Sequence, residues 1–369
     1  MKRCFLYTLL SVGLFTAPCE GQQAGELANA GIVSGTISLP EISAAAAVGC
    51  RLLVVADDPD RGGNRLHMIA LLDDAVTRLE RGGDIAIDPA EHIYAAMLRN
   101  LPGRKSKNVP DAETVKDIED AAVSPQGDIF LISSHSRSKK NKLPVERQRF
   151  VRLRIDRDSG DIESAAVISS AGILTKLPGE LARSTRRRPG QKNLLGGYNP
   201  GFNIEGLAWA PGCDVLVGLR SPTLDKEAVV LRLADANGVF DNPTKSAVLT
   251  METLLDLNGL GIRGMSYDGE RGGYWIIAGL SHDSDEPKAS GENGWSVWFW
   301  NGGTATAERT LQMKLRKTDL PPRTALNNPE AVTLLKKTSE EAARYLVLIS
   351  DNGAGEPSSY VLVPLDMLE

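Results

Sequence analysis

The stretch FNIEGLAWAPGCDVLVGLRSP, from Phe202 to Pro222, sets the pattern of the whole chain. It reads as an apolar strand, a Gly-containing turn and a second strand rich in Val and Leu. Two charges interrupt this pattern, because Glu205 lies near the start of the first strand and Arg220 at the end of the second. Strands joined by a short turn are antiparallel, so both charges are expected at the same end of the hairpin.

Four other segments repeat this strand–turn–strand pattern. They are PEISAAAAVGCRLLVVADD from Pro40, KDIEDAAVSPQGDIFLISSHSR from Lys116, GIRGMSYDGERGGYWIIAGLSHD from Gly261 and NPEAVTLLKKTSEEAARYLVLISDNG from Asn328. The positions equivalent to Glu205 are held by Ser43, Glu119, Arg263 and Glu330, and we call these five the key residues. Further strands follow in several units, as in RFVRLRID from Arg149 and WSVWFW from Trp295. A repeated unit of strands predicts an all-β fold built from blades.

The spacing of the units favours a β-propeller of five blades. Consecutive key residues are farther apart than the roughly 40 to 50 residues of a four-stranded blade, so the surplus is assigned to loops, at 100–115 and 178–201. A strand within Glu26 to Ser38 is expected to complete the last blade and close the ring without an open sheet edge. Six blades are the alternative, if a decayed unit hides in the two longest spacings.

The key residues are expected at one mouth of the central channel, because the first strand of a blade is the innermost. The ends of the second strands reach the same face, where they add Asp57, Asp58, His135, Arg137, Arg220, Ser281, His282, Asp351 and Asn352. Carboxylates, arginines and histidines in a concave mouth can hold a cation or polarise an oxyanion. The predicted ligand-binding residues are Glu119, Glu205, Arg220, Arg263, Glu330, Arg137 and His282.

Three functions are compatible with such a mouth. The first is the binding of a polar or anionic small molecule. The second is metal-assisted hydrolysis of phosphate or carboxylic esters, with Glu119, Glu205 and Asp351 holding a cation such as calcium and His135 as acid or base. The third is an interaction scaffold in which Glu205–Arg220 and Arg263–Glu330 are structural ties between blades. The sequence names neither the ligand nor the oligomeric state.

The N-terminus has the layout of a secretory signal peptide. Lys2 and Arg3 precede an apolar run, and small residues follow at Cys19 and Gly21. We expect cleavage after Gly21, which leaves residues 22–369 as a single propeller domain in the periplasm or outside the cell. Lipidation at Cys19 is the alternative. The apolar run is shorter than the roughly 18 residues of a membrane helix, so no transmembrane segment is expected.

Composition and cysteine positions narrow the functional classes further. The chain has 369 residues, 42% hydrophobic and 24% charged, as in a globular protein with a large core. Its 47 acidic and 42 basic residues give a formal net charge of −5, which argues against a nucleic-acid-binding protein. Cys50 and Cys213 occupy equivalent turns of non-adjacent units, and a disulfide needs Cα atoms within about 7 Å. We therefore predict that these two cysteines are not bonded to each other.

The ordered motifs DIEDAA, FLISSHSRSKK, NIEGLAW, DVLVGLRSP, GLGIRGM, NPEAV and LISDNG resemble those of a bacterial family known as domain of unknown function 3616. The resemblance runs from about Pro40 to Leu365 and implies a propeller-type fold without an assigned activity. More distantly, the chain is similar to secreted phytase-like and esterase-like propellers. Those would carry an acidic residue at every blade start, whereas this chain has Ser43 and Arg263, which puts a fully acidic calcium cluster in doubt.

Overall fold

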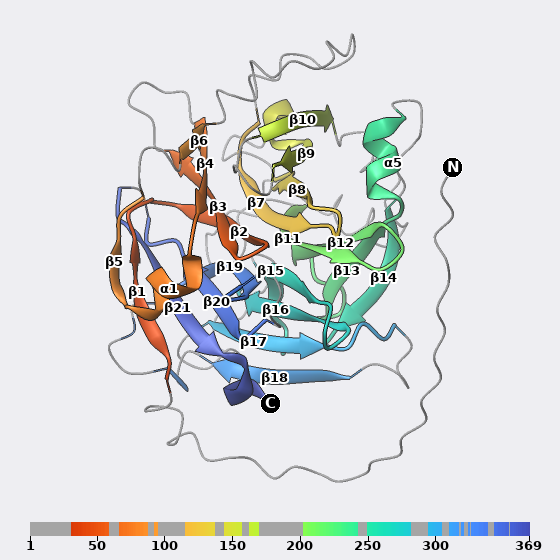
Figure 1. The fold of residues 1–369 in the computed structure, drawn as a ribbon. Coiled ribbons are helices and arrows are strands. Elements are labelled where there is room, and N and C mark those ends of the chain that lie inside the picture. Colours follow the sequence, from red (N-terminus) through yellow and green to blue (C-terminus); the bar gives the residue numbers. More distant parts are fainter. Residues whose placement is uncertain are drawn as a thin grey trace.

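The computed structural model describes residues 31–58, 66–87, 92–94, 115–136, 144–156, 162–169, 202–242, 249–281, 294–304, 310–316, 319–320, 324, 326–338, 343–353 and 355–369. These residues form five sheets arranged around one axis as the blades of a β-propeller (Figure 1). The predicted all-β fold with five blades is confirmed, and the six-blade alternative is wrong. No helix in these ranges is long and apolar enough to cross a membrane.

Each blade follows one of the five sequence units. The first blade contains β2 (Ile42–Val48), β3 (Arg51–Asp58), β4 (Leu66–Leu72) and β6 (His92–Tyr94). The second contains β7 (Ile118–Val123), β8 (Asp128–Ser133), β9 (Arg149–Ile155) and β10 (Ile162–Ser169). The third contains β11 (Asn203–Ala210), β12 (Asp214–Ser221), β13 (Ala228–Leu233) and β14 (Leu249–Leu255). The fourth contains β15 (Gly261–Asp268), β16 (Gly273–Gly279), β17 (Trp295–Trp300) and β18 (Leu311–Arg316).

The fifth blade closes the ring by combining the two ends of the chain. It contains β19 (Pro329–Leu335), β20 (Tyr345–Ser350), β21 (Ser358–Pro364), β1 (Val33–Ile37) and β5 (Gly83–Ile85). The N-terminal strand β1 lies beside β21 (Figure 1) and pairs with it in antiparallel register. The prediction that an N-terminal strand completes the last blade is therefore confirmed. β5, which adds a fifth strand in parallel to β1, was not expected from the sequence.

In the described ranges, the helical segments are short and lie outside the five sheets. They are α1 (Ala75–Glu80), α5 (Ala236–Asp241) and two 3₁₀ turns, Val145–Arg147 and Leu365–Leu368.

The core consists of five apolar layers, each between two neighbouring blades. Because both faces of a blade are covered, its strands read as apolar runs, and the inner strand β11 is buried along its whole length. The inner strands β2, β7, β11, β15 and β19 contact one another in a closed ring around the axis. This ring brings the starts of the five sequence units to one mouth of the channel.

The two described cysteines lie where the repeat places them. Cys50 follows β2 and Cys213 follows β11, each in the turn before the second strand of its blade. Both are free, so the prediction that they are not bonded to each other is confirmed.

Candidate functional site

Each inner strand has a shift in its pairing register at its key residue. In β11, Ile204 pairs with Leu219 and Gly206 with Gly218, so the ladder passes over Glu205. The same shift passes over Ser43, Glu119, Arg263 and Glu330 in the other four inner strands. A β-bulge inserts one residue into a strand and changes the direction of its side chain. The five key residues are thus equivalent bulged residues, which explains how polar groups fit at the start of apolar strands.

Small residues follow the bulge in four of the five inner strands, namely Ala44, Gly206, Gly264 and Ala331. A Cβ on Gly206 would lie 2.7 Å from Cγ2 of Ile262, and one on Gly264 would lie 2.9 Å from the carbonyl oxygen of Glu330. Neighbouring inner strands therefore approach each other too closely for larger side chains at these two positions.

Asp120 is the exception to this small-residue pattern, and sequence reasoning missed it. Its side chain is fully buried, and its Oδ2 accepts hydrogen bonds from the backbone N–H groups of Leu207, at 2.6 Å, and Met265, at 3.0 Å. Oδ1 accepts a third, from the N–H of Ala121 at 2.8 Å. Burial raises the pKa of Asp120 well above its usual range, although the three N–H donors act to lower it. Asp120 thus connects β7 to β11 and β15 across the axis.

Arg263 connects the third, fourth and fifth blades at the mouth. Its Nη2 forms an ion pair with Glu330, and its Nη1 donates to Oδ1 of Asn328 at 2.6 Å. Its Nε lies 3.5 Å from Oε2 of Glu205. The other oxygen of Glu205 accepts from Nη1 of Arg220 at 2.6 Å. The two pairs suspected as ties from the sequence, Glu205–Arg220 and Arg263–Glu330, are therefore both present.

Carboxylates surround Arg263 on several sides. Burial acts to lower the pKa of Arg263, but the negative charges of Glu330, Glu205, Glu119 and Asp351 outweigh it and raise the pKa. Burial, together with the charges of Glu205 and Asp351, raises the pKa of Glu330 to about 7, against the opposing effect of the arginines. Glu330 is therefore a carboxyl group that changes its charge near neutral pH.

Several buried polar atoms at this mouth lack a hydrogen-bond partner in the described part of the chain. Beside the key residues this is Oδ1 of Asn203. Oε2 of Glu205 and Nε of Arg263 also form no hydrogen bond, although they face each other at 3.5 Å in an ion pair. Oγ of Ser133, at the end of β8, and Nε1 of Trp295, at the start of β17, lie at the same ends of their blades. Because buried polar groups are normally paired, these atoms provide unused hydrogen-bonding capacity.

Two other predicted positions have different surroundings. Ser43 donates from Oγ to the carbonyl of Ile118 at 2.5 Å, which ties the first blade to the second. His135 is buried, and its Nδ1 lies 2.5 Å from the carbonyl oxygen of Ser133. Burial lowers the pKa of His135 to about 4, although this hydrogen bond acts to raise it, so the ring is neutral at pH 7.

Some predicted residues lie outside the described ranges. These are Arg137 and His282, together with the side chains of Asp57 and Asp58. Within the ranges, no group of three or more His, Cys, Asp or Glu side chains is arranged to hold a metal ion. The assignment of Glu119, Glu205 and Asp351 as metal ligands stays a prediction, as does the acid–base role of His135.

The family model described as "Protein of unknown function (DUF3616)" matches residues 141–358 of the chain. No curated protein matches the chain. Among solved structures, a luciferin-regenerating enzyme has 11% sequence identity and a TM-score of 0.38, and the match covers 88% of this chain and 78% of that one. An exo-β-1,3-galactanase from Phanerochaete chrysosporium has 12% identity and a TM-score of 0.43, with coverage of 89% and 61%. Similarity at this level assigns no activity.

Proposed function

The chain belongs to the family of proteins of unknown function DUF3616, and we propose that it is a binding protein which holds a polar small molecule at the mouth lined by the key residues. The observation that carries this proposal is a set of buried polar atoms there that form no hydrogen bond within the described ranges, namely Oδ1 of Asn203, Oε2 of Glu205 and Nε of Arg263, the last two of which meet only in an ion pair at 3.5 Å. A bound molecule would pair them.

The alternative of a scaffold with purely structural charges explains only part of this arrangement. The Glu205–Arg220 and Arg263–Glu330 pairs would serve as ties between blades. Leaving buried donors and acceptors unpaired costs about 1–3 kcal/mol for each group, and a tie has no use for that cost. In a ligand site the same atoms form hydrogen bonds once the molecule binds, so the cost is recovered on binding.

The charges of the side chains at the mouth favour a neutral polar ligand over an anionic one. The carboxylates around the mouth are Glu119, Glu205, Glu330 and Asp351, and the guanidiniums are Arg220 and Arg263. Since the negative charges outnumber the positive ones, an anion is repelled, whereas hydroxyl groups can donate to the carboxylates and accept from Nε of Arg263. We therefore propose a neutral ligand rich in hydroxyl groups, such as a sugar.

Metal-assisted hydrolysis, the other alternative, has less support. The guanidinium of Arg263 lies between Glu205 and Glu330, where it supplies the positive charge that a cation would supply. His135 is buried and neutral, with its ring facing the backbone at the end of β8.

The signal peptide expected at residues 1–21 also stays a proposal. It would place the site in the periplasm or outside the cell.

Isothermal titration calorimetry tests this proposal with a panel of neutral mono- and disaccharides and the matched sugar acids. We expect at least one neutral sugar to bind more tightly than its acid. Glu205→Gln should weaken that binding by tenfold or more, because it removes the carboxylate that meets both arginines. Glu163→Gln, an exposed position on β10, is the matched control and should change nothing. Tighter binding of the sugar acids, or no binding by any member of the panel, would contradict the proposal.

A further inference from the structure

A cavity of about 340 Å³ lies on the propeller axis, away from the key residues. The fourth residue after each key residue lines it, namely Ala47, Val123, Trp209, Tyr267 and Leu334. A strand rises about 3.3 Å per residue, so these five residues lie about 13 Å along the inner strands from the charged mouth. The cavity is therefore a part of the axis that is separate from the mouth.

The inner strands present free backbone edges to this cavity. Each of them is the terminal strand of its sheet and pairs with another strand of that sheet on one side only. Along such an edge, alternate residues direct both their N–H and their C=O groups away from the paired strand. The hydrogen bonds of Asp120 identify these residues, because its carboxylate accepts from the N–H groups of Ala121, Leu207 and Met265. The same three residues line the cavity.

The end of the cavity nearest Asp120 is built from hydrogen-bond acceptors. The N–H groups of Ala121, Leu207 and Met265 bond to Asp120, whereas their carbonyl groups come next along each strand, on the side of the cavity. We call these three carbonyl groups and the carboxylate of Asp120 the floor. A carboxylate has about four acceptor positions. Within the described ranges three are used, two on Oδ2 and one on Oδ1, so Oδ1 can accept one more hydrogen bond.

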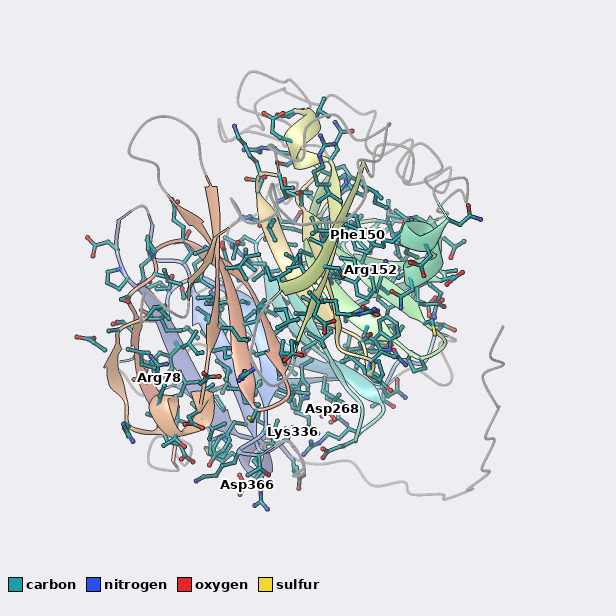
Figure 2. All side chains as sticks on the ribbon, turned by 45° about the horizontal axis from the view of Figure 1, so that its top comes forward. Arg78, Phe150, Arg152, Asp268, Lys336 and Asp366 are labelled. Atoms are coloured by element: carbon teal, nitrogen blue, oxygen red, sulfur yellow. The ribbon has the colours of Figure 1, made fainter. Side chains whose placement is uncertain are left out.

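The charges around the cavity favour a cation over an anion. The lining contains Asp268, Glu270 and Lys336, and Figure 2 shows Asp268 and Lys336 on the same side of the molecule. Asp268 forms an ion pair with Arg271 at 3.2 Å, and Glu270 accepts a hydrogen bond from a neutral backbone N–H. With Asp120 beneath them, these residues amount to three carboxyl groups against two cations.

A primary ammonium group complements the floor, because it has three N–H donors and no acceptor. Burial raises the pKa of Asp120 well above its usual range, although the three backbone N–H groups act to lower it. A cation in contact with the carboxylate favours its ionised form and so offsets the effect of burial.

The rest of the lining suits an apolar body. It includes the small side chains of Ala46, Ala122 and Ala208, which leave space on the axis. At about 30 Å³ for each water-sized group, the volume holds on the order of ten such groups. That is the size of a primary amine with a single aromatic ring.

We propose that this cavity is a second binding site, which takes a small primary amine with an apolar body. The ammonium group donates to Oδ1 of Asp120 and to the carbonyl groups of the floor, and the body packs against the alanines. None of the five key residues lines the cavity, so the site is independent of the proposed sugar site.

Calorimetry with phenethylamine and its neutral analogue 2-phenylethanol tests the proposal on the full-length protein. We expect phenethylamine to bind about tenfold more tightly than 2-phenylethanol. Asp120→Asn should abolish most of this preference, because it removes the charge and keeps a side-chain oxygen for the backbone N–H groups. Asp241→Asn changes an exposed carboxylate that pairs with Arg152, and as the matched control it should leave the preference unchanged.

A second variant tests the cavity itself. Ala47→Leu adds three carbon atoms to the lining from a partly exposed position and should weaken binding of both compounds, with folding of each variant checked by thermal unfolding. Glu205→Gln at the mouth should leave phenethylamine binding unchanged, which separates this site from the proposed sugar site. Equal affinity for the two compounds, no binding of phenethylamine, or a preference that survives Asp120→Asn would overturn the proposal.

Discussion

Arg263 determines the electrostatics of the mouth, because its buried guanidinium meets carboxylates from the third and fifth blades. Glu205 and Glu330 contact it directly, and its side chain is only 5% exposed. A positive residue at one bulge is what allows acidic residues at three others to lie close together. The sequence shows this only as an exception to the acidic pattern, since Arg263 occupies the position that holds glutamate in three units.

Replacing Arg263 should destabilise the fold strongly. Arg263→Met leaves Glu205 and Glu330 without their shared cation, and breaking a buried ion pair costs about 3–5 kcal/mol. Urea unfolding measures the fall in the free energy of unfolding. Adding Glu330→Gln to Arg263→Met should restore part of that free energy. Lys337→Met, which breaks an exposed pair with Glu80, should cost less than about 1 kcal/mol. Equal losses for the two single variants would contradict the central position of Arg263.

Glu330 should give the stability a specific pH dependence. Its pKa is about 7 in the folded protein and 4.5 without the fold, so the folded state binds the proton more tightly. Ionising this group therefore destabilises the fold. The destabilisation is absent below pH 4.5, grows toward pH 7 and is fully present above pH 7. Relative to the wild type, Glu330→Gln should become progressively more stable as pH rises through this window in urea unfolding. A constant difference at all pH values would show that the pKa is not raised.

At the scale of the element, the bulge is the feature that turns an ordinary inner strand into part of a site. The repeat predicts where strands begin and which residues are equivalent, and the structure bears out both. The repeat does not predict the bulge, because a register shift depends on how two strands pair and leaves no mark in either strand alone.

Asp120 was missed for a related reason. Its carboxyl reaches the backbones of β11 and β15, which are distant in sequence, although an acid among Ala and Gly at equivalent positions was a usable signal.

Asp120 should hold three inner strands together. Asp120→Ala leaves the N–H groups of Leu207 and Met265 without their acceptor, at a cost of about 1–3 kcal/mol each. Asp120→Asn keeps one carbonyl oxygen and should lose less. Thermal unfolding compares the two with Asp241→Ala, a change at an exposed residue paired with Arg152. If Asp120→Ala were as stable as the wild type, the carboxyl would not connect these strands.

At the scale of the whole molecule, closure of the ring fixes the geometry of the mouth. The fifth blade combines strands from both ends of the described chain, so every inner strand has another inner strand on each side. The sequence predicts this closure from the leftover N-terminal strand. It does not predict β5, because this strand depends on a distant segment of the chain reaching β1.

Gly35 tests the closure. A Cβ at this position of β1 would lie 2.0 Å from the carbonyl oxygen of Gly83 on β5, so Gly35→Val should separate the two strands and weaken the fifth blade. We expect a fall of several degrees in Tm by calorimetry. Ser34→Ala, at the exposed neighbouring position, should leave Tm unchanged. An unchanged Tm for Gly35→Val would mean that β5 contributes nothing to the closure.

The central claim is that the bulged key residues form a ligand site and do not serve only as ties. A high-resolution crystal structure of the protein with a bound sugar tests this most directly. We predict ordered sugar hydroxyls within hydrogen-bond distance of the cluster, with Oε2 of Glu205 and Nε of Arg263 paired either to the sugar or to water that the sugar holds. A mouth in which these two atoms are hydrogen-bonded directly to each other, in place of the 3.5 Å ion pair, with no sugar bound there, would contradict the account.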